Sequence, residues 1–135
     1  MLRKMKTRKI FEIITPEDSR PVSAFLRTLD SKEKKKISVQ LETLQHKDCP
    51  LKPPMVKAFQ QERHKGLFEL RTRINKHMTR IIFCFDEEDN AILLHGFVKK
   101  QERETISALE TARARKLALA NGDAETSEIL QGGTL

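Results

Sequence analysis

The sequence predicts a single α+β domain, an open antiparallel sheet with helices packed on one face. Three observations predict it. Residues 66–100 alternate apolar and polar side chains like three consecutive strands, helical periodicity precedes and follows them, and a strand-like run comes before the first helix. The order strand, helix, helix, three strands, helix is most simply buried as such an α+β layer. A length of 135 residues fits one domain and excludes a large multidomain enzyme.

The N-terminal half predicts one strand followed by a helical hairpin. Residues 8–14, RKIFEII, alternate and are rich in β-branched side chains, and Pro16 follows the run. Two helical stripes come next, one of Val22, Phe25, Leu26 and Leu29 and one of Ile37, Leu41 and Leu44. Pro21 suits a first helical turn, and Asp30 with Glu33 has the spacing of a capping box. These signals place two short amphipathic helices next to each other.

The middle of the chain predicts a long connection and then an antiparallel meander. Residues 46–65 contain three prolines, which remove backbone donors and disfavour helix, so this stretch is expected to be largely loop. Polar turns at residues 75–77 and 86–90 divide the following stretch into three strands.

The C-terminal part predicts one helix and a tail. The helical stripe consists of Ile106, Leu109, Ala112 or Arg113, and Leu117. Asn121-Gly122 is expected to end the helix. We therefore place the folded domain at residues 1–120 and expect residues 121–135 to be an acidic, flexible tail.

The charge balance favours an anionic partner. Lys and Arg total 26 against 19 Asp and Glu, which gives a net charge of +7 and a pI near 9.6. No apolar run approaches the ~18 residues that cross a bilayer, and no secretory signal is recognisable, so we expect a cytoplasmic protein with no membrane association. Cys49 and Cys84 stand in unrelated contexts and are expected to be free thiols. The scattered His and Cys residues favour neither a zinc site nor any other metal or cofactor.

Strand alternation gathers cations on one face of the predicted sheet. The residues placed there are Arg71, Arg73, Arg80, His95 and Lys99, and the preceding loop adds Lys57, Arg63, His64 and Lys65. The same alternation places Ile92, Leu94 and Val98 on the opposite, core face and Leu93 on the basic one. The runs at residues 32–36 and 113–116 fall on predicted helices and are interpreted as solvated faces.

Such a face suits a phosphate backbone, although cations on an exposed strand can also serve solubility alone. Arg pairs bidentately with phosphate oxygens. RNA cleavage without a metal requires proton transfer at two oxygens and stabilisation of charge on phosphorus, for which His, Lys and Arg are suitable. Glu69 is the only carboxylate on this face, which disfavours a two-metal nuclease. No dinucleotide-binding, P-loop or nucleophile-elbow motif occurs.

Three ordered motifs resemble a known family. They are Gly66 to Arg71 (GLFELR), Thr79 to Phe83 (TRIIF) and Leu93 to Lys100 (LLHGFVKK). Together they resemble the phage-derived, HigB-like branch of the RelE/ParE toxin superfamily over about residues 8–120. The resemblance implies a RelE-like fold and a toxin of a type II toxin–antitoxin pair. It also implies a metal-independent, ribosome-dependent mRNA endoribonuclease that is neutralised by a cognate antitoxin, often a helix-turn-helix protein.

By motif position, Arg71 and Arg80 are similar to the strand arginines that grip the phosphate and stabilise the transition state. His95 is the candidate for proton transfer. The candidate catalytic residues are therefore Arg71, Arg80, His95 and Lys99, and the candidate RNA-binding residues are Lys57, Lys65, Arg73, Lys100 and Arg103. The expected partners are mRNA, the ribosome and the antitoxin.

The chain departs from the family pattern at its aromatic residues. It has no Tyr, whereas RelE has a Tyr near its C-terminus that takes part in cleavage, and Ser107 lies near the equivalent place. Phe68 replaces the common Trp. Two other functions stay open: a ParE-like DNA gyrase inhibitor, and a non-catalytic basic RNA-binding module.

Overall fold

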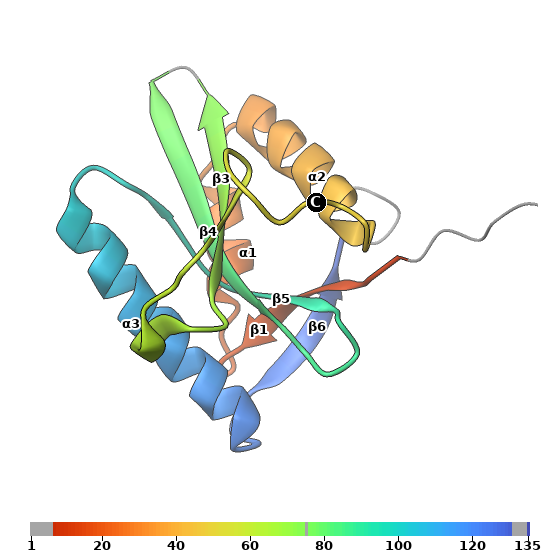
Figure 1. Ribbon diagram of the computed structural model, residues 1–135, viewed down its shortest axis with the longest axis vertical. Helices are drawn as coiled ribbons and strands as arrows, with labels where there is room; N and C mark the ends of the chain where they lie inside the picture. Colours follow the sequence, from red (N-terminus) through yellow and green to blue (C-terminus); the bar gives the residue numbers. More distant parts are fainter. Residues whose placement is uncertain (1–6, 75, 131–134) are drawn as a thin grey trace, which may run out of the picture.

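The structure is a computed structural model that describes residues 7–74, 76–130 and 135, and it confirms the predicted α+β class (Figure 1). In chain order the elements are β1 (Ile10–Ile14), α1 (Pro21–Arg27), α2 (Ser31–Gln45), β2 (Val56–Ala58), the 3-10 helix η1 (Glu62–His64), β3 (Phe68–Ile74), β4 (His77–Phe85), β5 (Ala91–Val98), α3 (Glu102–Ala120) and β6 (Glu125–Ile129). The six described strands form one sheet in the order β2-β3-β4-β5-β1-β6. Each neighbouring pair is antiparallel except β1 and β5, which run parallel.

The meander of β3, β4 and β5 forms as the alternation predicts. β3 pairs with β4 from Phe68 opposite Phe83 to Ile74 opposite His77. In the predicted first turn, His77 already belongs to β4, and Asn75 lies outside the described residues. The second turn is held by Asp86, whose carboxylate accepts bonds from the backbone N–H groups of Glu88 and Asn90, each at 2.9 Å.

Helices cover both faces of the sheet, so the prediction of helices on one face is wrong. α1 and α2 pack on one face in a cluster that includes Leu70 and Phe83. α3 packs on the other face in a cluster that includes Ile82 and Cys84. The strands are apolar on both sides over part of their length, and only helices on both faces bury that surface.

The helix boundaries follow their predicted signals. Asp30 caps α2, since its carboxylate accepts a 2.8 Å bond from the backbone N–H of Glu33. α3 ends at the predicted Asn121-Gly122. Gly122 adopts a φ of 77°, and the N–H of the next residue, Asp123, donates to the carbonyl of Ala118 at 2.8 Å. This is the bond pattern by which a left-handed glycine reverses the chain after a helix.

The buried face of α3 differs from the predicted stripe. The residues buried on α3 are Thr105, Ala108, Leu109 and Ala112. Ile106 and Leu117, which were predicted to be buried, are 58% and 47% exposed. The two alanines allow the helix to lie close to the sheet, and this close packing takes precedence over the placement of the larger apolar residues.

The C-terminal segment is not a frayed tail over residues 125–129. These residues form β6, which pairs antiparallel with β1 from Ile10 opposite Ile129 to Ile14 opposite Glu125. Leu130 follows and is 4% exposed within the α1–α2 core cluster. β6 covers the edge of β1 that would otherwise have unpaired backbone groups, which is the physical reason for the correction. Residues 131–134 lie outside the described part of the chain.

The predicted loop at residues 46–65 also contains structure. β2 pairs with β3, with Lys57 opposite Glu69, and extends the sheet at its other edge. η1 follows β2 and lies against α3, where Arg63 and His64 both bind Glu110. Cys49 and Cys84 are free thiols, as predicted. No helix in the described residues is both long and apolar enough to cross a membrane.

A bulge in β5 changes which side chains share a face. Ile82 pairs with His95 but Phe83 pairs with Leu93, so Leu94 is an extra residue between them. Ile92 and Leu94 therefore pack under α3, and Leu93 packs on the opposite face. The prediction for these three residues is wrong, because strict alternation does not hold across a bulge.

Gly96 of β5 allows α1 to approach the sheet closely. A Cβ at this position would overlap the ring of Phe25. We expect Gly96→Ala to lower the free energy of unfolding by about 1–3 kcal/mol, as overpacking does in cores. Urea denaturation measures the change. The double variant with Phe25→Ala is the control, because it removes the overlap and should lose less stability than the sum of the two single variants. Full additivity would contradict this explanation.

Candidate functional site

The strand register brings several of the predicted site residues together on the face that α3 partly covers. Arg71 of β3 lies directly opposite Arg80 of β4, and Arg80 lies opposite Phe97 of β5. The neighbouring row across the sheet consists of Lys57, Glu69, Ile82 and His95. The cations predicted to share a face thus come from adjacent strands. We call Arg71 and Arg80 the arginine pair.

A buried carboxylate holds the arginine pair. Glu69 is fully buried, and its Oε1 accepts bonds from Arg71 Nε at 3.0 Å and from Arg80 Nη1 at 2.7 Å. Like charges directly opposite one another in a sheet repel, and the shared Glu69 oxygen offsets that repulsion while leaving the group one positive charge in excess. The side chains of Arg71 and Arg80 are only 25% and 11% exposed. The sequence predicts that Arg80 faces open solvent, and that prediction is wrong because the side chain is largely buried beside Glu69.

Lys99 and Glu102 lie beside the arginine pair. Lys99 Nζ binds Glu102 Oε2 at 2.5 Å, and this bond is the largest cause that lowers the pKa of the exposed Glu102 carboxyl. The positive charges of Lys57 and Arg80 lower the same pKa further. The Glu102 carboxylate is thus stabilised by three cations, Lys57 of β2, Arg80 of β4 and Lys99 at the end of β5. The three cations outnumber the Glu102 carboxylate, so the net positive charge here attracts a phosphate.

The other predicted RNA-binding residues are exposed and more dispersed. Arg73, Lys100 and Arg103 are exposed at the end of β3 and around the start of α3. Lys65 is also exposed but follows η1, whose ion pairs lie on α3 at Glu110. Lys57 lies opposite Glu69, and Lys99 binds Glu102, whose carboxyl is also within range of the Arg80 charge. Lys65 has no contact with the arginine pair among the described residues.

His95 is held by a residue that sequence reasoning missed. Arg115 Nη1 lies 3.0 Å from His95 Nδ1 and donates to the carbonyl of Leu94 at 2.9 Å. A guanidinium only donates, so Nδ1 must accept, and the proton of the neutral ring is on Nε2. Burial, and then the charge of Arg115, lower the pKa of His95 to about 4. The ring also stacks on Phe97, with centroids 5.9 Å apart.

His95 is therefore a neutral hydrogen-bond donor through Nε2 at pH 7. It is poorly suited to be a general base, because the nitrogen that could accept a proton already binds Arg115. No local sequence pattern indicates this contact, since Arg115 lies within a helical charge run that typically faces solvent.

Removal of Arg115 is expected to free His95 to titrate. In Arg115→Met we expect the pKa of His95 to rise from about 4 part of the way to its ordinary ~6.5. The unfolded chain binds a proton to His95 between those two values and the folded chain does not, so His95 lowers stability as pH falls through that window. Arg115→Met should therefore narrow the pH range over which His95 lowers the stability of the folded protein.

Proton NMR titration of the His95 ring measures the shift, with the exposed His77 as an internal control. A His95 titration that stays the same in Arg115→Met as in the wild type would contradict the contact.

Comparison with family sequences identifies a match to much of the chain. The family described as "Phage derived protein Gp49-like (DUF891)" matches residues 24–117, which is more than half of the chain. The chain belongs to this Gp49-like family. The matched range contains the arginine pair, Glu69, His95 and Arg115. A search of curated proteins gave no match.

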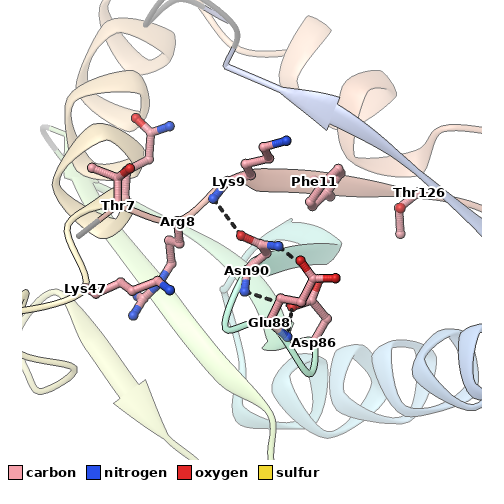
Figure 2. Close-up of a pocket in the computed structure, with 10 residues that line it drawn as sticks. Thr7, Arg8, Lys9, Phe11, Lys47, Asp86, Glu88, Asn90 and Thr126 are labelled. Carbon is pink, nitrogen blue, oxygen red and sulfur yellow. Dashed lines mark hydrogen bonds between the residues drawn. The ribbon is translucent and has the colours of Figure 1, made fainter.

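The Gp49-like protein also has a polar pocket of about 490 Å³ beside the start of β1 (Figure 2). Figure 2 shows Asn90 between β1 and the β4–β5 turn: it accepts a 2.9 Å bond from the backbone N–H of Lys9 and is held by Asp86. Arg8, 4% exposed, binds the carbonyl of Leu44 and the carboxylate of Asp89. These contacts tie the turn to β1, which is a structural role.

The chemistry available on the basic face of the Gp49-like protein is electrostatic. Two guanidinium groups lie side by side with their geometry fixed, and an ammonium group and a neutral imidazole N–H lie on the same face. Fixed donors of this kind stabilise charge that develops in a transition state. Within residues 7–74, 76–130 and 135, no group of three His, Cys, Asp or Glu side chains is placed to share a metal ion.

Proposed function

We propose that this Gp49-like protein is the toxin of a type II toxin–antitoxin pair and that it cleaves mRNA on the ribosome without a metal ion. The observation that carries the proposal is the arginine pair, held side by side by the buried Glu69 next to Lys57 and Lys99. Membership of a phage-derived family is compatible with a toxin role. The proposed partners are mRNA, the ribosome and a cognate antitoxin with a helix-turn-helix domain, all in the cytoplasm.

In the proposed reaction the 2′-oxygen of a ribose attacks the adjacent phosphorus. The 2′-hydroxyl loses its proton to solvent, a bond from the 2′-oxygen to phosphorus forms, and the bond to the 5′-oxygen breaks. Arg71 and Arg80 bind the non-bridging oxygens, where negative charge increases. His95 Nε2–H donates a further hydrogen bond, and Lys99 protonates the departing 5′-oxygen. The products are a 2′,3′-cyclic phosphate and a free 5′-hydroxyl.

The dependence on the ribosome follows from the weak proton acceptors of this face. His95 is locked as a donor, and Glu69 is buried beneath the two arginines. Without a strong base, the rate depends on how well the 2′-oxygen is aligned with the leaving group. A ribosome that holds the mRNA in a bent conformation would supply that alignment, so we expect the free protein to cut free RNA slowly.

Two parallel assays of the purified protein distinguish the proposal from its alternatives. In a reconstituted translation reaction we expect protein synthesis to stop and mRNA fragments to accumulate, whereas DNA supercoiling by gyrase continues. Inhibited supercoiling with normal translation would indicate a ParE-like gyrase inhibitor instead. RNA binding without inhibition of translation or of supercoiling would indicate a non-catalytic basic RNA-binding module. Either outcome contradicts the proposed endoribonuclease.

A further inference from the structure

A second basic surface lies between α2 and the end of β3. It is a groove of about 440 Å³ lined by Lys32, Lys35, Lys36, Val39, Arg73 and Ile74, and we call it the α2–β3 groove. All four of its cationic residues are exposed. Val39 is 55% exposed and, with Ile74, gives the groove an aliphatic floor.

The groove is positive because of how α2 is oriented on the sheet. Lys32, Lys35, Lys36 and Val39 recur at the spacing of one helix face. The acidic residues of the first turn point elsewhere: Asp30 caps the helix, and Glu33 accepts a 3.3 Å bond from the Thr79 hydroxyl. Among the residues that the structure describes, no carboxylate lines the groove. Three lysines of the run at residues 32–36 therefore line a groove with the end of β3, in addition to being exposed to solvent.

Hydrogen bonds fix α2 against the strand that carries the arginine pair. Lys36 Nζ donates to the carbonyl of Arg73, and Gln40 Nε2 donates to the carbonyl of Arg71 at 2.7 Å. Arg73 lines the groove and lies two residues beyond Arg71 on β3. The arginine pair lies on the α3 face and α2 packs on the other face, so an RNA strand that reaches both passes around the edge of β3 at Arg73, beyond the last β3 residue that pairs with β2.

We propose that the α2–β3 groove binds phosphates of the RNA outside the cleaved bond, so that one strand contacts both the arginine pair and α2. This inference rests on the proposed function, since it assumes that the substrate is RNA. Four cations with no carboxylate fit a chain of phosphates, and lysine ammonium groups on flexible stems bind a backbone without reading its sequence. A ribose or base can lie against the aliphatic floor.

The test compares two variants that lose the same charge. The groove variant is Lys32→Gln/Lys35→Gln/Lys36→Gln. The control variant is Lys9→Gln/Lys34→Gln/Lys47→Gln, which removes three lysines that do not line the groove, one of them on α2 itself. Binding is measured over a range of salt concentrations with 2′-O-methyl RNA, which cannot form the cyclic product. The long RNA has about 20 nucleotides and the short one about five, too few to reach both sites.

We expect the groove variant to bind the long RNA at least about tenfold more weakly than the control variant does. We also expect the slope of log affinity against log salt concentration for the long RNA to be smaller in magnitude by about 2 in the groove variant than in the wild type. Each of the three lost phosphate contacts contributes ~0.7 to that slope. The affinity of the groove variant for the short RNA should fall much less, because the arginine pair still binds it. Equal losses of long-RNA affinity in both variants would overturn the inference. So would a groove variant that still binds the long RNA more tightly than the short one by the same factor as the wild type. Tighter binding of a polyglutamate peptide than of long RNA, lost in the groove variant, would assign the groove to an acidic protein and also overturn it.

Cleavage by the wild-type protein on ribosomes separates this inference from the proposed function. If no mRNA is cut but long-RNA binding depends on the groove, the endoribonuclease proposal fails and the groove assignment stands. If mRNA is cut and the groove variant still prefers the long RNA over the short one as the wild type does, the groove assignment fails and the proposed function stands.

Discussion

Replacement of Glu69 by alanine is expected to lower the free energy of unfolding by about 3–5 kcal/mol. Glu69 is fully buried, and its Oε1 binds both Arg71 and Arg80. Its removal would leave two guanidinium groups opposite each other with no counter-charge, and Arg80 is only 11% exposed. Urea denaturation measures the loss.

Two further variants show whether the buried charge is the cause. Glu102→Ala removes a carboxylate that is 73% exposed and paired with Lys99, so its urea midpoint should stay close to that of the wild type. Replacing Glu69, Arg71 and Arg80 together by leucine and methionine should recover much of the stability, because no charge is then left unpaired. A Glu69→Ala protein as stable as Glu102→Ala would contradict the account.

Replacement of Arg80 by lysine is expected to slow cleavage of ribosome-bound mRNA by about 100-fold or more while the protein stays folded. Lysine keeps the positive charge beside Glu69 but cannot offer the planar fork that binds two phosphate oxygens. Loss of one fixed donor to a transition-state oxyanion costs about this factor. Single-turnover cleavage on programmed ribosomes measures the rate, and circular dichroism confirms the fold.

The lysine variant is preferable to alanine for a structural reason. If Arg80 faced open solvent, as the sequence predicts, Arg80→Ala would fold with little loss of stability, but in the structure that variant leaves the buried Glu69 charge without Arg80. Arg63→Lys is the matched control, since Arg63 is exposed and binds Glu110 on α3. Equal cleavage by Arg80→Lys and Arg63→Lys would show that the arginine fork has no part in the chemistry.

Much of the fold could be predicted because it depends on local patterns. Apolar alternation identified the β3–β4–β5 meander, and the same period of two placed Arg71 and Arg80 on one face. Capping chemistry at Asp30 and Gly122 predicted where α2 begins and α3 ends. Each of these features is encoded within a few residues of where it acts.

The features that were missed depend on contacts between distant segments. Arg115 reaches His95 from 20 residues away. β6 pairs with β1 from the other end of the chain, and a short polar strand such as ETSEI has no strong pattern of its own. The bulge at Leu94 is one extra residue that alternation cannot locate. Glu69 was visible in the sequence, but its role depends on burial between two arginines.

The chemical form of the mRNA ends produced on ribosomes shows whether the ribose 2′-oxygen attacks the phosphorus, as proposed for the basic face. We expect fragments with a 2′,3′-cyclic phosphate and a 5′-hydroxyl, made by the wild-type protein and strongly reduced in Arg80→Lys. Fragments with 3′-hydroxyl and 5′-phosphate ends would require attack by water rather than by the ribose. Those ends, or intact mRNA in the presence of folded protein, would contradict the account.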